Sequence, residues 1–353
     1  MPSPELLRSR VDYPSYDQVA ALDPLDLDKI MVYLPELNAQ GAVEAIVEAT
    51  VYATGNAASL ASPSRADALA SIRDLDFLAS SVLRHNQNPL EIVDRLEEQL
   101  VRLGGVAKSV PRGTVFTYAA ANPSGERRRS FTGTQEEEVF IGAVIRSILA
   151  LDGAMDGVGQ IALSNVAGLQ EVLVGSSVAM DEMIDSIVEV RRTVSPEFFS
   201  FQMRPYFESL VIDGQKLTGS GGAQMQLLAV DRMLWGCEDD DSGYNDFFDD
   251  NWRYLTPVQQ GALDNYLRLN GGRSIVSKLT DGSEVSNDTR DAAIGLLKKI
   301  KKFRYPHRKI AQDNFRLRPS DAVGSGSFKP DILDVLIEKT ETSISLIEGA
   351  KNA

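Results

Sequence analysis

Apolar residues recur every three or four positions along almost the whole chain, the spacing that places side chains on one face of an α-helix. Runs in which apolar and polar residues alternate are scarce. The pattern therefore predicts an all-α protein. The expected helices span residues 42–52, 65–85, 89–103, 135–151, 158–174, 180–192, 196–210, 223–235, 257–269, 289–315 and 329–346.

Helix boundaries are indicated by hydroxyl residues before proline and by paired glycines. Ser195-Pro196 and Thr256-Pro257 suit helix starts, because proline at a first helical position loses no hydrogen bond. Glycine pairs at 104–105 and 271–272 are expected to end helices. At most a minor β-hairpin is expected, between residues 108–118 and a short segment at 211–216.

Two stretches, 104–134 and 269–288, are rich in Gly, Pro, Ser and Thr and are expected to form long loops over a site. Neither has the composition of a domain linker. The predicted organisation is an N-terminal, mostly helical region at 1–134 that covers the site, and a helical core at 135–353. Together they are expected to form one compact unit.

Composition and charge narrow the class of protein. The 353 residues are 43% hydrophobic and 24% charged, as in soluble globular proteins, and no apolar run reaches the roughly 18 residues of a membrane span. A start without an apolar signal core and a single cysteine, Cys237, favour the cytoplasm. A net charge of −14 disfavours a nucleic-acid partner. The basic stretch 298–309 is interpreted as an exposed face rather than an anion site.

The scarcity of metal-binding side chains excludes several chemistries. With two histidines and one cysteine, a Cys/His zinc site cannot be completed, and no phosphate-binding loop or serine-hydrolase elbow is present. A metal held by one or both histidines remains possible. Heme iron needs a single imidazole and an apolar slot, whereas non-heme iron needs both histidines and a carboxylate.

The two histidines have different surroundings. His307 follows Pro306 in an amphipathic stretch at 296–315, where a helix is expected to kink. His85 stands at a predicted helix C-terminus, with Asn86 available for a left-handed cap. The residues alone favour a surface position for His307 and a structural role for His85.

Seven segments of the chain carry a family resemblance. They are DPLDLDKIMVYLPELN (23–38), RDLDFLASSVLRH (73–85), RRSFTGTQEE (128–137), SPEFFSFQMRPYFE (195–208), DGQKLTGSGGAQMQLLAVDRMLWG (213–236), FRYPHRK (303–309) and VGSGSF (323–328). In this order they resemble the monodechloroaminopyrrolnitrin synthases, which belong to the heme-dependent dioxygenase superfamily. The C-terminal half is also similar to the indoleamine dioxygenases.

The resemblance implies heme b as the cofactor and His307 as the proximal ligand of its iron. Positions matching the family's small-residue loop, its distal pocket, its substrate border and its C-terminal Gly-rich turn are implied to contact cofactor or substrate. For the cofactor these are Ser220, Gly221, Gly222 and Ser325; for the substrate they are Phe140, Val144, Phe199, Arg204, Phe315, Ser325 and Gly326. Phe315 replaces a tyrosine of the family, so a polar contact to the substrate is expected to be lost.

The resulting expectation is an indoleamine 2,3-dioxygenase-like helical heme protein that uses O2 to oxidise tryptophan or a related aromatic amino acid or indole in secondary metabolism. No catalytic side chain is expected over the iron. One alternative is a heme-dependent, tyrosine-type hydroxylase or peroxygenase on the same scaffold. The other is a heme-binding sensor without enzymatic activity.

Overall fold

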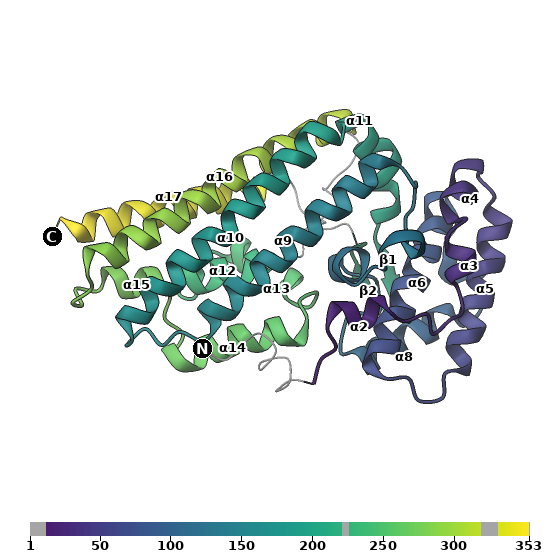
Figure 1. Cartoon of the computed structure of the whole chain (residues 1–353), viewed down its shortest axis with the longest axis horizontal. Coiled ribbons are helices and arrows are strands. Elements are labelled where there is room, and N and C mark those ends of the chain that lie inside the picture. Colours follow the sequence, from purple (N-terminus) through teal and green to yellow (C-terminus); the bar gives the residue numbers. More distant parts are fainter. Residues whose placement is uncertain (1–11, 221–225, 319–330, 353) are drawn as a thin grey trace.

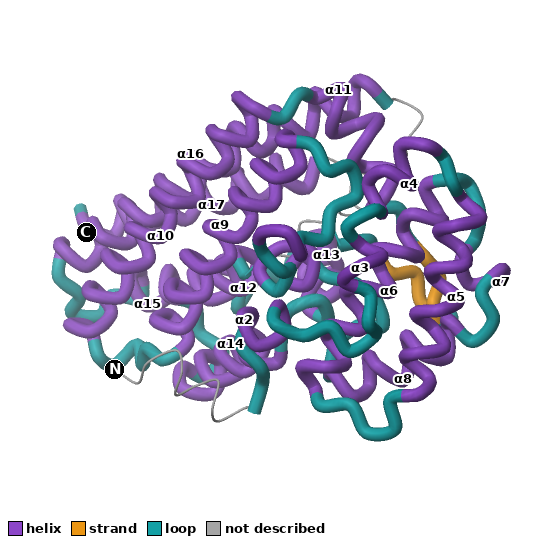
Figure 2. Tube along the Cα trace, turned by 45° about the vertical axis from the view of Figure 1, so that its right-hand side comes forward, coloured by secondary structure: helices purple, strands orange, loops and turns teal. Residues whose placement is uncertain are grey.

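A computed structural model describes residues 12–220, 226–318 and 331–352, and these residues are overwhelmingly helical (Figures 1 and 2). The predicted all-α class with a minor hairpin is confirmed. The first part contains α2 (Tyr16–Ala20), α3 (Asp28–Met31), α4 (Leu34–Gln40), α5 (Val43–Ser59), α6 (Arg65–Arg84), α7 (Pro89–Ile92), α8 (Leu96–Ala107), a π-helical turn η1 (Phe116–Ala120) and a 3-10 turn η2 (Gly125–Arg127).

The second part begins with the two long helices α9 (Gln135–Gly159) and α10 (Val166–Thr193). It continues with α11 (Pro196–Phe198), the turns η3 (Phe199–Met203) and η4 (Arg204–Phe207), strands β1 (Leu210–Ile212) and β2 (Gln215–Leu217), α12 (Leu227–Asp231), η5 (Arg232–Gly236), α13 (Ser242–Trp252), α14 (Pro257–Asn270), α15 (Ile275–Thr280), α16 (Asn287–Leu317) and α17 (Asp331–Lys351).

The long helices form a row in which α10 packs against both α9 and α16, and α16 packs against α17 (Figure 1). The short N-terminal helices gather at the other end of the molecule, around the buried helix α6. Because α10 lies between α9 and α16, these two helices can face each other across a space without touching closely. That space holds the candidate site.

The predicted hairpin partner was wrong. Residues 108–118 do not pair with 211–216; instead β1 and β2 pair with each other in antiparallel register, and the earlier segment enters η1. The turn between the strands is Asp213-Gly214, and both residues have positive φ, 49° and 69°. This backbone matches the tight hairpin turn that Asp-Gly favours, a signal that the sequence contained.

Three predicted helix boundaries were also wrong. The helices expected at 158–174 and 180–192 are one helix, α10, because packing on both sides outweighs the weak propensity of Gly175 and its neighbours. Helix α8 continues through Gly104, where a Cβ would lie 3.0 Å from the Cα of Pro111. Beyond Pro196 the helix widens into the π-helical turn η3 and then tightens into the 3-10 turn η4, because Pro205 has no N–H to continue it.

The predicted caps at Ser195, Thr256 and Gly271 are confirmed. The Ser195 side chain accepts from the N–H of Phe198, Thr256 forms a capping box with Gln259, and Gly271 ends α14 with a φ of 60°.

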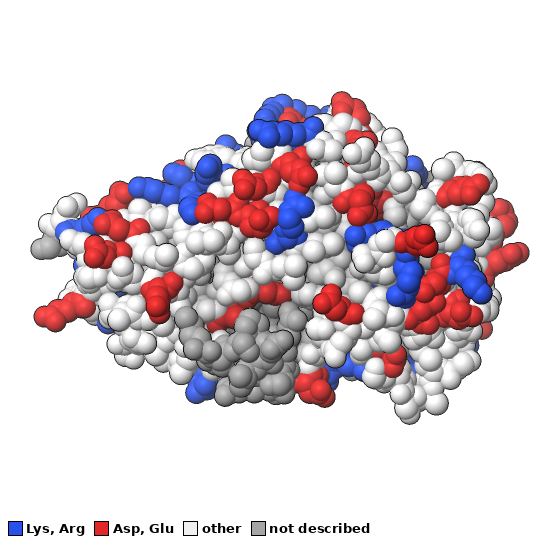
Figure 3. Space-filling model, in the orientation of Figure 1, with Lys and Arg blue, Asp and Glu red and all other residues white. Residues whose placement is uncertain are grey.

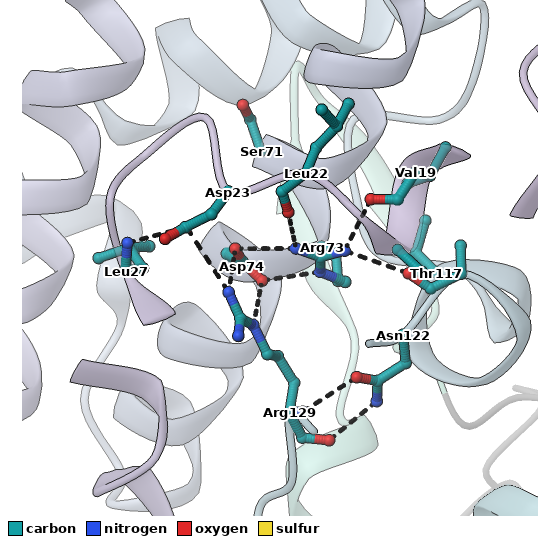
Figure 4. A network of polar contacts seen from close by, with 12 residues as sticks. Val19, Leu22, Asp23, Leu27, Ser71, Arg73, Asp74, Thr117, Asn122 and Arg129 are labelled. Carbon is teal, nitrogen blue, oxygen red and sulfur yellow. Dashed lines mark hydrogen bonds and ion pairs between the residues drawn. The ribbon is translucent and has the colours of Figure 1, made fainter. Parts of the chain in front are cut away.

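Buried charges tie the N-terminal helices together (Figure 4). Each carboxylate oxygen of Asp74 accepts one bond from Arg73 and one from Arg129, at 2.8–3.1 Å. Other N–H groups of Arg73 reach the backbone carbonyls of Val19 and Leu22, and Arg129 also pairs with the carboxylates of Asp28 and Asp23. The side chains of Asp74 and the two arginines are fully buried. Burial opposes ionisation of Asp74, but the two guanidinium groups outweigh it and lower its pKa.

The basic stretch 298–309 is laced with ion pairs to neighbouring helices. Lys299 pairs with Asp181 on α10, Lys301 with Glu341 on α17, and the buried Arg304 with Asp231 on α12. The stretch is therefore an interhelical face rather than a simple solvated one. On the face shown in Figure 3, basic and acidic side chains are interspersed. None of the helices in the described ranges is both long and apolar enough to cross a bilayer.

Candidate functional site

A cavity of about 290 Å³ opens between α9, α10 and α16. Its lining is mainly apolar, with a few polar groups among aliphatic and aromatic side chains. The residues are Val115, Phe140, Ala143, Val144, Ser147, Ser186, Ile187, Val190, Arg191, Val194, Ser195, Pro196, Phe199, Phe303, His307, Ile310, Ala311, Asp313 and Asn314. A mostly apolar hollow with few polar groups is the usual form of a small-molecule site.

His307 faces this cavity from α16. Ile300, Phe303, His307, Ile310 and Asn314 follow one another at steps of three or four residues, so they share one face of the helix. That face is the inner one, and the basic residues around His307 occupy the others. The surface position that composition favoured for His307 was wrong; the helical spacing already contained the contrary signal.

Helix α16 holds His307 in a fixed frame. The helix begins with Ser286 as N-cap and runs without a break through Pro306 to Leu317. One turn before the histidine, Arg304 donates to the carbonyl of Leu336 at 3.2 Å and to the hydroxyl of Thr340 at 2.7 Å, both on α17. These contacts fix the part of α16 that carries the imidazole.

The imidazole of His307 is neutral and has an unused hydrogen-bonding capacity. Burial, with a smaller contribution from the nearby Arg304 guanidinium, lowers its pKa to about 4. Its ring lies 5.7 Å from that of Phe303, and among the described residues it has no hydrogen-bond partner. A neutral imidazole nitrogen is the form that binds a metal ion.

Helix α9 provides the wall that faces α16. Phe140, Ala143, Val144 and Ser147 line the cavity from this helix, and none of them is ionisable. The ring of Phe199, from η3, lies 5.7 Å from that of Phe140 at an interplanar angle of 53°. The structure thus brings His307, Phe140, Val144 and Phe199 together, as the resemblance implied.

The polar groups of the cavity escaped the sequence analysis. Ser186 and Arg191 line it from α10, and Asn314 and Asp313 from α16. The Asp313 carboxylate accepts from Lys309 at 2.6 Å, so its charge is compensated locally. Helical spacing places Ser186 and Arg191 on the same face as Ile187 and Val190. This spacing was the available signal, but α10 was divided at 175–179 and its inner face was not recognised.

Other predicted contact residues lie elsewhere or outside the described ranges. Ser220 is buried and hydrogen-bonds the carboxylate of Asp76; Arg204 is buried in η4, and Phe315 is half-buried on α16. None of these three lines the cavity as the described residues define it. Gly221, Gly222, Ser325 and Gly326 lie outside the described residues, and their roles stay predictions.

His85 does not line the cavity either. It caps the C-terminal end of α6, and Asn86 adopts the left-handed conformation with a φ of 62°, as predicted. Burial, then the charge of Arg84, lowers its pKa, so the imidazole is less basic than a free one. Within residues 12–220, 226–318 and 331–352, no group of three or more His, Cys, Asp or Glu side chains is close enough to hold a metal ion. The arrangement disfavours a non-heme iron site built from both histidines.

The fold and the site together define the class of this protein. It is an all-α protein in which a single neutral histidine faces an apolar cavity between long helices. A family model described as monodechloroaminopyrrolnitrin synthase PrnB matches residues 36–342, which include all three walls of that cavity. The chain belongs to this family. It is a family of oxygenases, and the chain is accordingly an enzyme.

Proposed function

We propose that this enzyme is a heme-dependent oxygenase that acts with O2 on tryptophan or a related indole in secondary metabolism. The observation that carries the proposal is the neutral His307 facing the apolar cavity. Membership of the monodechloroaminopyrrolnitrin synthase family supports a substrate derived from tryptophan. We place the activity in the cytoplasm, in keeping with the single, half-buried Cys237.

The residues around the cavity fit a heme group. One axial imidazole, an apolar slot and cations near the carboxylates are what heme requires of a protein. His307 would supply the first, and α9 and α16 the second. When bound, heme iron supplies the activation of dioxygen.

The side chains of this chain would then bind and orient the substrate and exclude water from the cavity. Phe140 and Phe199 offer aromatic faces to a flat substrate, and Val144 keeps water from the wall opposite His307. Because α9 contributes no ionisable group to the described lining, proton transfer by a side chain of this wall is not part of the proposal. Position and exclusion of water are the protein's contribution.

The decisive experiment compares the two histidines. His307→Ala should abolish the Soret band of the heme-supplemented protein, whereas His85→Ala, the matched control, should keep it because His85 lies outside the cavity lining. An unchanged Soret band in His307→Ala would refute the proposal. Product analysis under O2 then separates ring oxidation of tryptophan from hydroxylation of tyrosine.

A further inference from the structure

Helix α10 presents a face to the cavity that no predicted site residue occupies. Ser186, Ile187, Val190, Arg191 and Val194 all line the cavity, at the spacing of one helical face. Three of these side chains are apolar. The other two are polar and lie five residues apart, a rise of about 7.5 Å along the helix axis.

The hydroxyl of Ser186 is buried without a partner. The residue is only 2% exposed, and its Oγ makes no hydrogen bond to any residue in the described ranges. A serine within a helix usually bonds the carbonyl four residues back. A buried hydroxyl left unpaired is costly, so a group within the cavity is the natural partner.

Arg191 stands at the outer end of the same face. Its side chain is exposed, and the described part of the chain offers it no ion pair or hydrogen bond. Neighbouring cations are already paired: Arg146 with Glu182 and Glu189, and Lys309 with Asp313. Among the described residues that line this cavity, Arg191 is therefore the cation available to a ligand.

We propose that the α10 face is a specificity site with two contacts, in which Ser186 accepts a hydrogen bond from a ring N–H and Arg191 binds a carboxylate. A guanidinium pairs with a carboxylate through two parallel hydrogen bonds, and a serine hydroxyl accepts as well as donates. A ligand with an apolar ring between these two groups fits the three apolar residues between them. This inference rests on the proposed function, and it narrows the ligand to an aromatic amino acid with a ring N–H.

The carboxylate that binds Arg191 could belong to the amino-acid group of the substrate or to a porphyrin propionate. The following experiment distinguishes the two. The dissociation constants of L-tryptophan, tryptamine and 1-methyl-L-tryptophan are measured on the heme-loaded full chain from Soret shifts. The rate of heme loss to excess apomyoglobin is measured in parallel.

The chain provides a matched control for each substitution. Ser176 lies on α10, is also 2% exposed and also has an unpartnered Oγ within the described structure, yet it does not line the cavity. Arg192 is exposed next to Arg191 and likewise does not line it. Each pair differs in position and not in chemistry.

Arg191→Gln should weaken L-tryptophan at least tenfold and leave tryptamine unchanged, because tryptamine has no carboxylate. If Arg191→Gln instead speeds heme loss and weakens both ligands alike, the carboxylate is a propionate. Ser186→Ala should weaken L-tryptophan several-fold but not 1-methyl-L-tryptophan, which lacks the N–H. Equal effects of Ser186→Ala and Ser176→Ala, or of Arg191→Gln and Arg192→Gln, overturn the proposal.

Failure of this site is distinguishable from failure of the heme assignment. If the wild-type protein takes up no heme, the proposed function fails. The thermal shift produced by L-tryptophan against tryptamine in the heme-free chain still measures the contact with Arg191. A carboxylate-dependent shift that Arg191→Gln abolishes supports the inference; a shift that Arg191→Gln leaves unaltered contradicts it.

Discussion

Two buried polar regions of the molecule are built on opposite rules. Each carboxylate oxygen of Asp74 accepts two hydrogen bonds, and the guanidinium groups of Arg73 and Arg129 bind acceptors within the protein. Around His307, by contrast, the imidazole and the Ser186 hydroxyl have no hydrogen-bond partner among the described residues. Saturated groups stabilise the fold, whereas open groups are available to a ligand.

The difference teaches where to look for function in a helical protein. Buried charge by itself is a poor guide, since the most highly charged buried cluster here is structural. The informative feature is polar capacity that the protein does not use. In the cavity between α9, α10 and α16 that capacity lies beside a hollow able to hold a ligand, whereas the unpartnered hydroxyl of Ser176 does not line the cavity.

Substitution in the saturated network should have the largest effect on stability. Asp74→Asn removes the counter-charge of the buried Arg73 and one of the carboxylates that pair with Arg129, and should lower the free energy of unfolding by about 3–5 kcal/mol. Urea denaturation followed by circular dichroism measures it. As a control, Glu98→Gln removes an exposed ion pair with Arg95 and should barely move the midpoint. A small effect of Asp74→Asn would contradict the structural role.

A substitution that fills the cavity should impair heme binding with little effect on the stability of the fold. Val144→Trp places a large ring opposite His307 and should reduce heme uptake at least a hundredfold, while the free energy of unfolding changes by less than about 2 kcal/mol. Leu149→Trp on the same helix is the control, because Leu149 is 55% exposed and does not line the cavity. Soret titration and urea denaturation of both variants test the contrast. Heme uptake at the wild-type level in Val144→Trp would show that the ligand binds elsewhere.

Lowering the pH should have the smallest effect of all, since we expect it to leave heme affinity almost unchanged. Protons compete with iron for the imidazole, and they win only below the imidazole's pKa. With the pKa of His307 lowered to about 4 by burial, heme affinity should stay nearly constant from pH 7 to pH 5. An imidazole with an ordinary pKa of about 6.5 would lose its affinity for heme iron by a factor of about 25 over that interval.

The same pKa shift fixes the sign of the stability change in the heme-free protein. The unfolded chain takes up a proton on His307 at a higher pH than the folded chain does. The contribution of His307 to the free energy of unfolding is therefore fully present above pH 6.5 and is lost as the pH falls towards 4.

Soret titrations at intervals of half a pH unit test the expected constancy of heme affinity. A loss of heme affinity by a factor of about 25 at pH 5 would show that the imidazole is solvated.

Much of the fold was predictable because helical spacing is a local signal. The starts at Ser195 and Thr256 follow from capping chemistry within four residues, and α16 agrees with its predicted range to within two residues at each end. Local rules failed where contacts distant in sequence decide. Helix α10 remains continuous through Gly175 because α9 and α16 pack along it.

The candidate site was predictable in part. The resemblance supplied His307, Phe140, Val144 and Phe199, which the structure places around one cavity. It did not supply Ser186 or Arg191, since their meaning depends on which face of α10 is turned inward and on which partners they lack. Neither property is visible before the helices are assembled.

Because the protein has only two histidines, their imidazole rings can serve as probes of ligand binding. A nitrogen-detected magnetic resonance spectrum contains the imidazole signals of His85 and His307 alone, and one substitution assigns both. Both rings have lowered pKa values, but only His307 faces the cavity. Each ligand that enters can therefore be followed as a change in one imidazole, with the other serving as an internal reference in the same tube.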